Sequence, residues 1–520
     1  MRVAGIITLA ALTVSSLTAF VPAGEPTKQE FLAEVEKKLR TVTEQAGPAI
    51  ACVVVSKSDR YPKAASGDTP GKLGGYDPKK LPPAQAADRS LDLSDPKTIP
   101  DHGCACGVVI DASGLVLTPY HVIDGATKIY VHLPGRPGSY ADIYAADARY
   151  DLAVLKLITP PPGVTAVKFA DVRLTAVNRQ PATVYKDKLV VLLSIPPATG
   201  FALGDPSADL ECVRGVRPAP DVDQKADRER PSDSYYLFGP LLAYGSLLAH
   251  EPAPAHATDG SPLLNLDGEL VGLTTSTAAL TSERGPHYAF PADEHFRRVV
   301  DVLRRGEEVE YGYLGVMGPH SVVGGLDRKP FGVRFDSVIA QGPAAQAGLD
   351  ERDIVIRVAG HPTTNYPELL HNIGSALAGE KVPVTIQRGG GGRDRQIDVT
   401  LGKFKNDQPF IASVRPDPVF GLRVEYGSVL SQKQIPNEPR ARLAVPPGVC
   451  VRELIADSPA ATAFKKLGDR PDRWLITSLN GAPVSTPAEF YKAAKGQQAI
   501  RLTVRDPAEL NSRDREVTFP

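Results

Sequence analysis

An internal repeat in the C-terminal part of this 520-residue chain most limits the folds that it can adopt. Both copies begin with an apolar strand, near residues 313 and 420. Each continues through a turn of sequence G-P-A-A or S-P-A-A, at 342–345 and 458–461, and then through a strand, a helix and a last strand. Because a repeat of this size is one folding unit, the sequence predicts two similar α+β domains. Their expected bounds are 311–404 and 416–520.

The chain before this repeat is predicted to be mainly β, because short apolar runs alternate there with tight turns. Thr27 and Glu30 have the spacing of a capping box, which begins a helix ahead of the first strand. Residues 57–102 are rich in proline, glycine and charge without periodicity, which indicates a long surface loop. An amphipathic helix is expected at 293–305. We therefore expect one further domain over 24–310.

The first 23 residues are interpreted as a secretory signal peptide. Met1 and Arg2 precede an apolar run at 3–21, and small residues follow at the position that a signal peptidase reads. An uncleaved membrane anchor is the alternative, but the run is short for a span and is interrupted by hydroxyl side chains. No later part of the sequence reads as a membrane span. The sequence therefore predicts a secreted or periplasmic protein.

Charge and cysteine content restrict the possible partners and cofactors. The net charge of −1 gives no electrostatic reason to expect binding to nucleic acid or to an anionic membrane. Five cysteines are an odd number, so at least one has no partner within the chain. Cys104 and Cys106 lack a second ligand pair at metal-binding spacing. We interpret the cysteines as buried thiols with at most one disulfide, and we expect no metal and no cofactor.

Three segments in the predicted β domain carry a pattern of catalytic residues. The first, 117–126, contains His121, and the second, 150–156, contains Asp151. The third, 258–272, follows them in the order histidine, aspartate, nucleophile. Together with the repeat, these segments resemble the HtrA family, whose members have a trypsin-like double β-barrel followed by two PDZ domains. The resemblance implies that His121 is the general base and that Asp151 orients it.

The third segment departs from the family at the nucleophile. The family pattern reads G-x-S-G-G-P, whereas this chain has Ala257, Asp259 and Ser261 at the first glycine, the serine and the last glycine. Asp259 places a negative charge where an oxyanion would form, and it favours a protonated His121. A shifted loop that presents Ser261 is a rival interpretation, although Pro262 aligns without a gap. A metal site built from the histidine and the two aspartates is a third, less economical one.

The repeat supplies the expected ligand-binding function. A PDZ domain binds a peptide as an added strand and receives its C-terminal carboxylate in a loop. By resemblance, Tyr313, Leu314, Gly315 and Val316 form that loop in the first copy, and a helix at 367–377 forms the opposite wall. A PDZ fold that only packs against the barrel is the alternative. The second copy suits a ligand less well, because its loop differs and a polar insertion follows at 431–446.

We therefore expect an exported HtrA-like protein with a trypsin-like domain that lacks protease activity. It would bind unfolded proteins or protein C-termini through its PDZ domains, as a chaperone or adaptor in protein quality control. The opposing hypothesis is an active serine endopeptidase of the HtrA type. The resemblance also implies a homo-oligomer, since members of this family are typically trimers.

Overall fold

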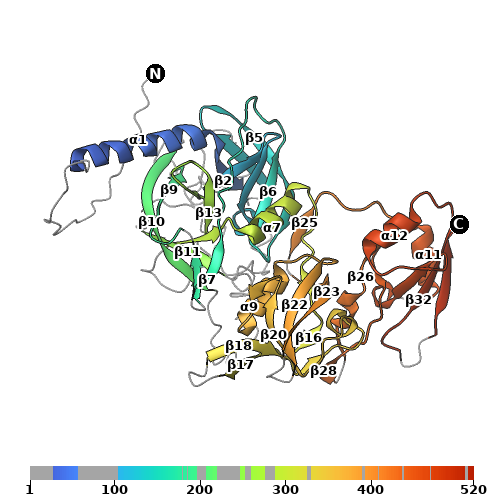
Figure 1. The fold of residues 1–520 in the computed structure, drawn as a ribbon. Helices are drawn as coiled ribbons and strands as arrows, with labels where there is room; N and C mark the ends of the chain where they lie inside the picture. Colours follow the sequence, from blue (N-terminus) through green and yellow to red (C-terminus); the bar gives the residue numbers. More distant parts are fainter. Residues whose placement is uncertain are drawn as a thin grey trace, which may run out of the picture. The chain divides into compact units, whose positions relative to one another are not determined.

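A computed structural model describes most of the chain as two compact units (Figure 1). The described residues are 27–56, 104–177, 180–183, 185–195, 206–218, 246–251, 259–275, 287–324, 329–388, 393–407, 409–435, 438–468, 470–509 and 513–519. The first unit runs up to Glu308 and also takes in Gln408–Ser413, and the second comprises Val309–Asp407 and Val414–Pro520. Within the described ranges, no helix has the length and apolarity that a membrane span requires. The signal peptide predicted at 1–23 lies outside these ranges.

The first unit begins with helix α1, Lys28–Ala46, where the capping box predicted it. The backbone N–H of Glu30 donates to the Thr27 hydroxyl, and the Glu30 carboxylate accepts from the backbone N–H of Thr27. These two bonds satisfy N–H groups that a helix start leaves unpaired. Pro48 lies in the short 3₁₀ turn Gly47–Ala49, which ends the helix and leads into the first strand.

A first barrel follows, formed by six strands that close on themselves. The ring order is β5, β4, β1, β2, β3, β6, and a pairing between β5 and β6 completes it. The strands are β1 Ile50–Ser56, β2 Cys104–Asp111, β3 Leu115–Pro119, β4 Lys128–Leu133, β5 Arg136–Asp147 and β6 Leu152–Leu157. β1 pairs directly with β2 although the segment predicted as a long loop, 57–102, separates them in sequence. That loop lies outside the described residues.

One further strand joins this barrel from a distant part of the sequence. β25, Phe410–Ala412, pairs antiparallel with the end of β5, and Ile411 lies opposite Ala146. The segment lies between the two predicted PDZ domains, where no element was expected. A three-residue strand is too short to show the period-2 alternation by which strands are recognised.

The second barrel is also closed and is followed by a helix. Its ring order is β10, β11, β14, β13, β12, β9. The strands are β9 Leu189–Ser194, β10 Ser207–Pro218, β11 Ser246–Glu251, β12 Pro262–Leu264, β13 Leu270–Thr275 and β14 His287–Pro291. A separate hairpin is formed by β7 Leu174–Val177 and β8 Gln180–Thr183. Helix α7, Glu294–Arg304, confirms the amphipathic helix predicted at 293–305, and Asp293 caps it through the Phe296 N–H.

The second unit confirms the internal repeat, because it contains two sheets with the same strand order. In the first copy the sheet strands are β17 His320–Gly324, β18 Lys329–Arg334, β20 Asp353–Val358, β21 His361–Pro362, β22 Lys381–Arg388 and β23 Asp394–Thr400. In the second they are β26 Leu422–Tyr426, β29 Val449–Leu454, β30 Leu475–Leu479, β31 Ala482–Pro483, β32 Ile500–Arg505 and β33 Arg515–Phe519. The helices correspond as well: α8 Pro343–Gln346 with α11 Pro459–Lys465, and α9 Tyr366–Gly374 with α12 Pro487–Ala494. Each copy has its own buried apolar core.

The two copies differ at their edges. The first has two short strand pairs beside its sheet: β15 Gly312–Tyr313 with β24 Gly402–Lys403, and β16 Val316–Met317 with β19 Ser337–Val338. The second has an insertion between β26 and β29, where the sequence predicted a polar insertion. It contains helix α10 Ser428–Ser431 and the hairpin β27 Gln434–Ile435 with β28 Glu438–Arg442.

The structure describes the side chains of four cysteines. Cys52, Cys106 and Cys450 are buried, and Cys212 is half-buried. The side chain of Cys104 lies outside the described part, so the number of disulfides stays a prediction.

Candidate active site

His121 and Asp151 lie together at the rim of the first barrel. His121 is in α4, Tyr120–Ile123, which follows β3 directly, and Asp151 lies between β5 and β6. Because β3 pairs with β6, with Pro119 opposite Leu152, the two residues are brought side by side. The His121 N–H donates to Oδ1 of Asp151 at 2.8 Å, and the Tyr120 N–H donates to the Asp151 carbonyl at 3.0 Å.

Asp151 has a backbone conformation that is uncommon for a residue with a side chain. Its φ angle is 54°, in the left-handed region, and its side chain is only 6% exposed. Such conformations cost energy and persist where the surrounding structure holds them, often at functional sites. The two hydrogen bonds to α4 provide that support.

The His121 ring is held between two carboxylates. Nδ1 lies 2.7 Å from Oδ2 of Asp151, and Nε2 lies 2.9 Å from Oδ2 of Asp259. The Asp259 side chain is 24% exposed and that of His121 is 36% exposed, so the second contact is open to solvent on one side. The three residues that the sequence singled out are therefore brought into one cluster, with the histidine in the middle.

The protonation of His121 follows from this geometry. Burial alone would lower the pKa of His121, but hydrogen bonds to Asp151 and Asp259 and the charges of both carboxylates raise that pKa to about 10. With both ring nitrogens facing carboxylate oxygens, the doubly protonated imidazolium satisfies both contacts. At neutral pH the ring is therefore a cation and has no free lone pair with which to accept a proton.

The loop that carries Asp259 is fixed by backbone hydrogen bonds on both sides. The Cys106 N–H donates to the Asp259 carbonyl at 2.8 Å, and the Gly260 N–H donates to Thr274 at 2.9 Å. Gly260 has a φ of +78°, and a Cβ there would lie 2.1 Å from the Cys106 carbonyl oxygen. Only glycine fits this position. The backbone at Asp259 and Gly260 is therefore fixed where the Asp259 side chain meets His121.

Ser261, the rival nucleophile, directly precedes β12. It has no exposed surface, and its carbonyl accepts from the Thr274 N–H at 2.9 Å, at the start of the strand pair β12–β13. Ala257 lies outside the described residues, so the donors of an oxyanion hole are not seen. The third interpretation, a metal site, needs ligands that converge on one point. The two carboxylates instead approach opposite nitrogens of the His121 ring. Among the described residues, no group of three histidine, cysteine or acidic side chains has a metal-binding arrangement.

A second buried acid–base pair lies in the second barrel and was missed in the sequence. Glu211 in β10 and His250 in β11 are both fully buried, and a carboxylate oxygen of Glu211 contacts Nδ1 of His250. His287 lies opposite His250 in β14, with ring centroids 5.9 Å apart. Burial and then the charge of His250 lower the pKa of His287, while the charge of Asp259 opposes this. β10 also contains Asp209 and Arg214, so no pattern in the sequence marked Glu211 as the buried acid.

The predicted carboxylate-binding residues begin the first repeat copy. Tyr313 lies in β15, and the next two carbonyls are fixed: Leu314 accepts from the Ala344 N–H at 2.9 Å and Gly315 from the Ile339 N–H at 3.0 Å. Gly315 has a φ of +82°, which favours glycine. The helix expected at 367–377 is α9, Tyr366–Gly374, so it ends three residues earlier than predicted. Leu377 instead forms a β-bridge with Tyr311.

Comparisons with known proteins agree with these features. Residues 105–273 match the trypsin-like peptidase domain family, and residues 303–401 match the PDZ domain family. A probable periplasmic serine endoprotease, DegP-like, from Pseudomonas putida (strain W619) is 27% identical over 488 residues, with 90% of each chain covered. Its counterpart from Marinomonas sp. (strain MWYL1) is 29% identical over 396 residues, covering 75% of this chain and 73% of the relative.

Two solved structures are similar at lower identity. A serine endoprotease from Yersinia pestis has 19% identity and a TM-score of 0.40, covering 71% of this chain and 98% of its own. The HtrA-type protease AlgW with tripeptide has 16% identity and a TM-score of 0.45, covering 71% of this chain and 98% of its own.

Proposed function

This chain belongs to the HtrA family, and from that premise we propose that it is an exported pseudo-protease that binds peptides through its PDZ domains. It would bind unfolded proteins or protein C-termini as a chaperone or adaptor. The observation that carries the proposal is the contact of Asp259 with Nε2 of His121 at 2.9 Å. In a working enzyme of this fold, that nitrogen accepts the proton of the serine hydroxyl.

The chemistry of a carboxylate at this position supports the loss of activity. An attack by Asp259 on a peptide carbonyl would form a mixed anhydride and would have to expel an amine. The carboxylate is the far better leaving group, so the tetrahedral intermediate would collapse back to the peptide. The negative charge of Asp259 would also oppose the oxyanion that the transition state forms. Finally, a His121 pKa of about 10 would keep the ring protonated at neutral pH, so the base would be missing as well as the nucleophile.

The peptide-binding part of the proposal rests on the first PDZ domain. Gly315 turns the chain in the left-handed region, and the carbonyls on either side of it are fixed by Ala344 and Ile339. A loop fixed in this way can present backbone N–H groups to a carboxylate without reorganising. The relatives are named periplasmic proteins, and we propose the same location after removal of the signal peptide. A trimer is proposed from the family resemblance.

An active serine endopeptidase is the second candidate, and two observations favour it. The relatives are named serine endoproteases. The contact between Asp151 and Nδ1 of His121, at 2.7 Å, is also the arrangement that catalysis needs. Activity would then require the loop to shift so that Ser261 replaces Asp259 beside His121.

A fluorophosphonate probe separates the two candidates, because it labels only an activated serine. We expect no labelled peptide by mass spectrometry and no hydrolysis of casein by the mature protein. The Ser261→Ala variant is the matched control, and it should behave in the same way as the unchanged protein. Labelling of Ser261, together with casein cleavage that Ser261→Ala abolishes, would establish the endopeptidase instead.

A further inference from the structure

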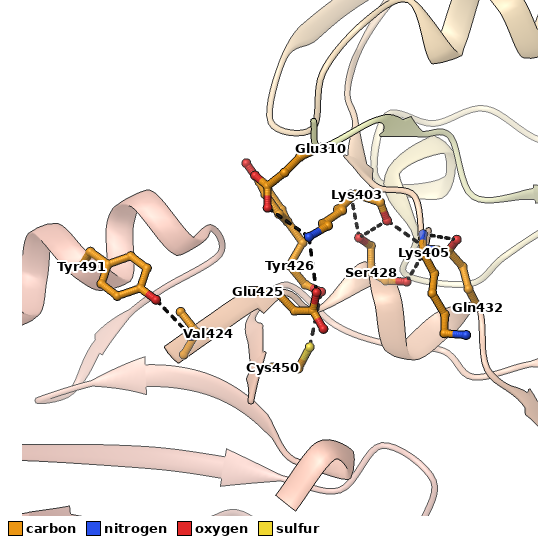
Figure 2. A network of polar contacts seen from close by, with 10 residues as sticks. All are labelled: Glu310, Lys403, Lys405, Val424, Glu425, Tyr426, Ser428, Gln432, Cys450 and Tyr491. Atoms are coloured by element: carbon orange, nitrogen blue, oxygen red, sulfur yellow. Dashed lines mark hydrogen bonds and ion pairs between the residues drawn. The ribbon is translucent and has the colours of Figure 1, made fainter. Parts of the chain in front are cut away.

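The two PDZ domains share a buried ion-pair network. Lys403, in β24 of the first domain, is 3% exposed. Its Nζ lies 3.1 Å from Oε1 of Glu310 in the first domain and 3.4 Å from Oε2 of Glu425 in the second (Figure 2). A buried ammonium is costly unless it is paired, and removing a partner leaves an uncompensated charge. Lys403 therefore favours the arrangement in which both domains supply a carboxylate.

Helix α10 of the second domain also binds the backbone of β24. The Ser428 hydroxyl accepts from the Lys403 N–H at 2.8 Å and donates to the Lys403 carbonyl at 3.1 Å. Gln432 donates to the same carbonyl at 2.8 Å and accepts from the Lys405 N–H at 2.9 Å (Figure 2). A Cβ at Gly402 would lie 2.7 Å from the Ser428 Cβ, so this approach depends on glycine. The short strand β24 forms few hydrogen bonds within its own domain. Side chains from the insertion of the second domain thus bind backbone groups at Lys403 and Lys405.

This network reaches the peptide site of the first domain. β24 pairs with β15, where Tyr313 lies opposite Gly402 and begins the carboxylate-binding loop. Burial raises the pKa of Tyr313, and a side-chain hydrogen bond with Ser431 of α10 opposes that rise. The Tyr426 hydroxyl donates to the Ala378 carbonyl at 3.2 Å, beyond the end of α9. The second domain therefore contacts both the first residue of the loop and the segment that follows α9.

The groove of the second domain, in contrast, is closed by its own residues. A peptide added to β26 would need the N–H groups on the free edge of that strand. The Val424 N–H instead donates to the hydroxyl of Tyr491 in α12 at 3.1 Å, so this tyrosine crosses the space between helix and strand (Figure 2). Tyr491 thus takes the place of a ligand carbonyl.

The loop that precedes β26 is closed as well. Val419 and Leu422 exchange two backbone hydrogen bonds of 2.9 Å each, which forms a tight turn through Phe420 and Gly421, both at positive φ. The Leu422 N–H, which corresponds to that of Val316 in the first domain, is therefore already paired. In the first domain, the corresponding residue Tyr313 instead pairs with Gly402 of β24.

We propose that the second PDZ domain is a fixed support that positions the carboxylate-binding loop of the first, and that it is not itself a peptide-binding site. The proposal rests on the proposed function for the first domain. Lys403 and Ser431 are positioning residues in this scheme, because neither needs to touch the peptide.

The test is a titration of the full mature chain with a fluorescent peptide that has a free, apolar C-terminus. We expect one peptide per chain. Lys403→Met should weaken the affinity by about fivefold or more, which is the range of a typical coupling between sites, and Ser431→Ala should weaken it less. Lys381→Met is the matched control. Lys381 lies on β22 of the same domain, is exposed, and pairs only with Asp398 among the described residues. The affinity of this variant for the peptide should therefore not change.

A second readout does not depend on peptide binding. In hydrogen exchange, Lys403→Met should speed the exchange of the amides at 313–316, whereas Lys381→Met should leave it unchanged. Two peptides per chain, or binding that survives Gly315→Val, would show that the second groove is open and would overturn the proposal. Unchanged affinity and unchanged exchange in Lys403→Met would overturn the supporting role. If the unchanged protein binds no peptide, the proposed function fails. The hydrogen-exchange result then decides by itself whether the second domain positions the loop of the first.

Discussion

The Nε2 atom of His121 lies 2.9 Å from Oδ2 of Asp259, at the distance from which it would take a proton from a serine hydroxyl in an enzyme of this fold. The carboxylate has no proton to give at neutral pH, so the hydrogen in this contact belongs to the imidazole. In the pseudo-protease that we propose, Asp259 would thus stand in for the nucleophile and also change the charge of the base. Asp151 keeps its contact with Nδ1.

The first prediction concerns the pKa of His121. Asp259→Asn should lower that pKa from about 10, because it removes one of two carboxylates, but Asp151 should keep it above the ordinary value of about 6.5. A titration of the His121 ring signals by NMR measures the change. Asp171→Asn is the control, since Asp171 is an exposed carboxylate that pairs with Arg173. An unchanged pKa in Asp259→Asn would show that the contact is absent in solution.

The second prediction concerns stability at high pH. The folded pKa of His121, about 10, is above its unfolded value, so the cluster stabilises the fold fully below about pH 6.5 and loses this effect as the pH rises through 10. Because the His121 side chain is 36% exposed, we expect a loss of about 1 to 2 kcal/mol rather than the full amount that the shift would imply. Urea unfolding at pH 7 and pH 10.5 measures it. In His121→Asn, the free energy of unfolding should fall less between pH 7 and pH 10.5, because the titrating ring is gone. An identical pH dependence in both proteins would contradict the prediction.

The third prediction concerns the restoration of activity. Asp259→Ser alone should give little or no casein hydrolysis, because Ala257 and Ser261 still occupy positions that are glycine in the family pattern. The triple variant Ala257→Gly, Asp259→Ser, Ser261→Gly should be clearly more active, since one lost oxyanion donor costs about two to three orders of magnitude in rate. Equal activity in the two variants would mean that the nucleophile was the only defect.

The fourth prediction concerns the loop that carries Asp259. Gly260→Ala should destabilise the first unit by at least about 2 kcal/mol more than Gly268→Ala does. Both glycines have nearly the same positive φ, but a Cβ at Gly260 meets the Cys106 carbonyl at 2.1 Å, whereas at Gly268 the nearest atom is 3.6 Å away. Gly268→Ala thus measures the cost of the positive φ alone, without a steric clash. Equal losses in urea unfolding would show that the loop can move away from β2.

Sequence reasoning was strongest where chemistry or periodicity is local. The capping box at Thr27 and Glu30 and the helix after Asp293 follow from neighbouring residues, and the repeat follows from the same local pattern in two segments. The structure confirms all three. Contacts between distant segments leave no such pattern. The bond from Val424 to Tyr491 joins a backbone group to a side chain far along the chain, and nothing in the spacing of either residue indicates it.

The candidate site shows the same division. The order of His121, Asp151 and Asp259 was visible from motifs, but whether Asp259 or Ser261 faces the histidine depends on the backbone path of one loop. That path is set by bonds to Cys106 and Thr274, which lie in other strands. The buried pair of Glu211 and His250 depends likewise on the register of β10 against β11.

Strand β25 gives the chain an unusual connectivity. Because the segment Gln408–Ser413 belongs to the first unit, the polypeptide leaves that unit, forms the first PDZ domain, returns to pair with β5, and leaves again. The first PDZ domain is thus inserted within the sequence of the first unit, which the chain leaves before it and re-enters after it. A gene truncated just after the first PDZ domain would leave the edge of β5 uncovered and open to pairing with another chain. A shortened chain that ends just after residue 413 would instead keep β25, and with it the cover of this edge.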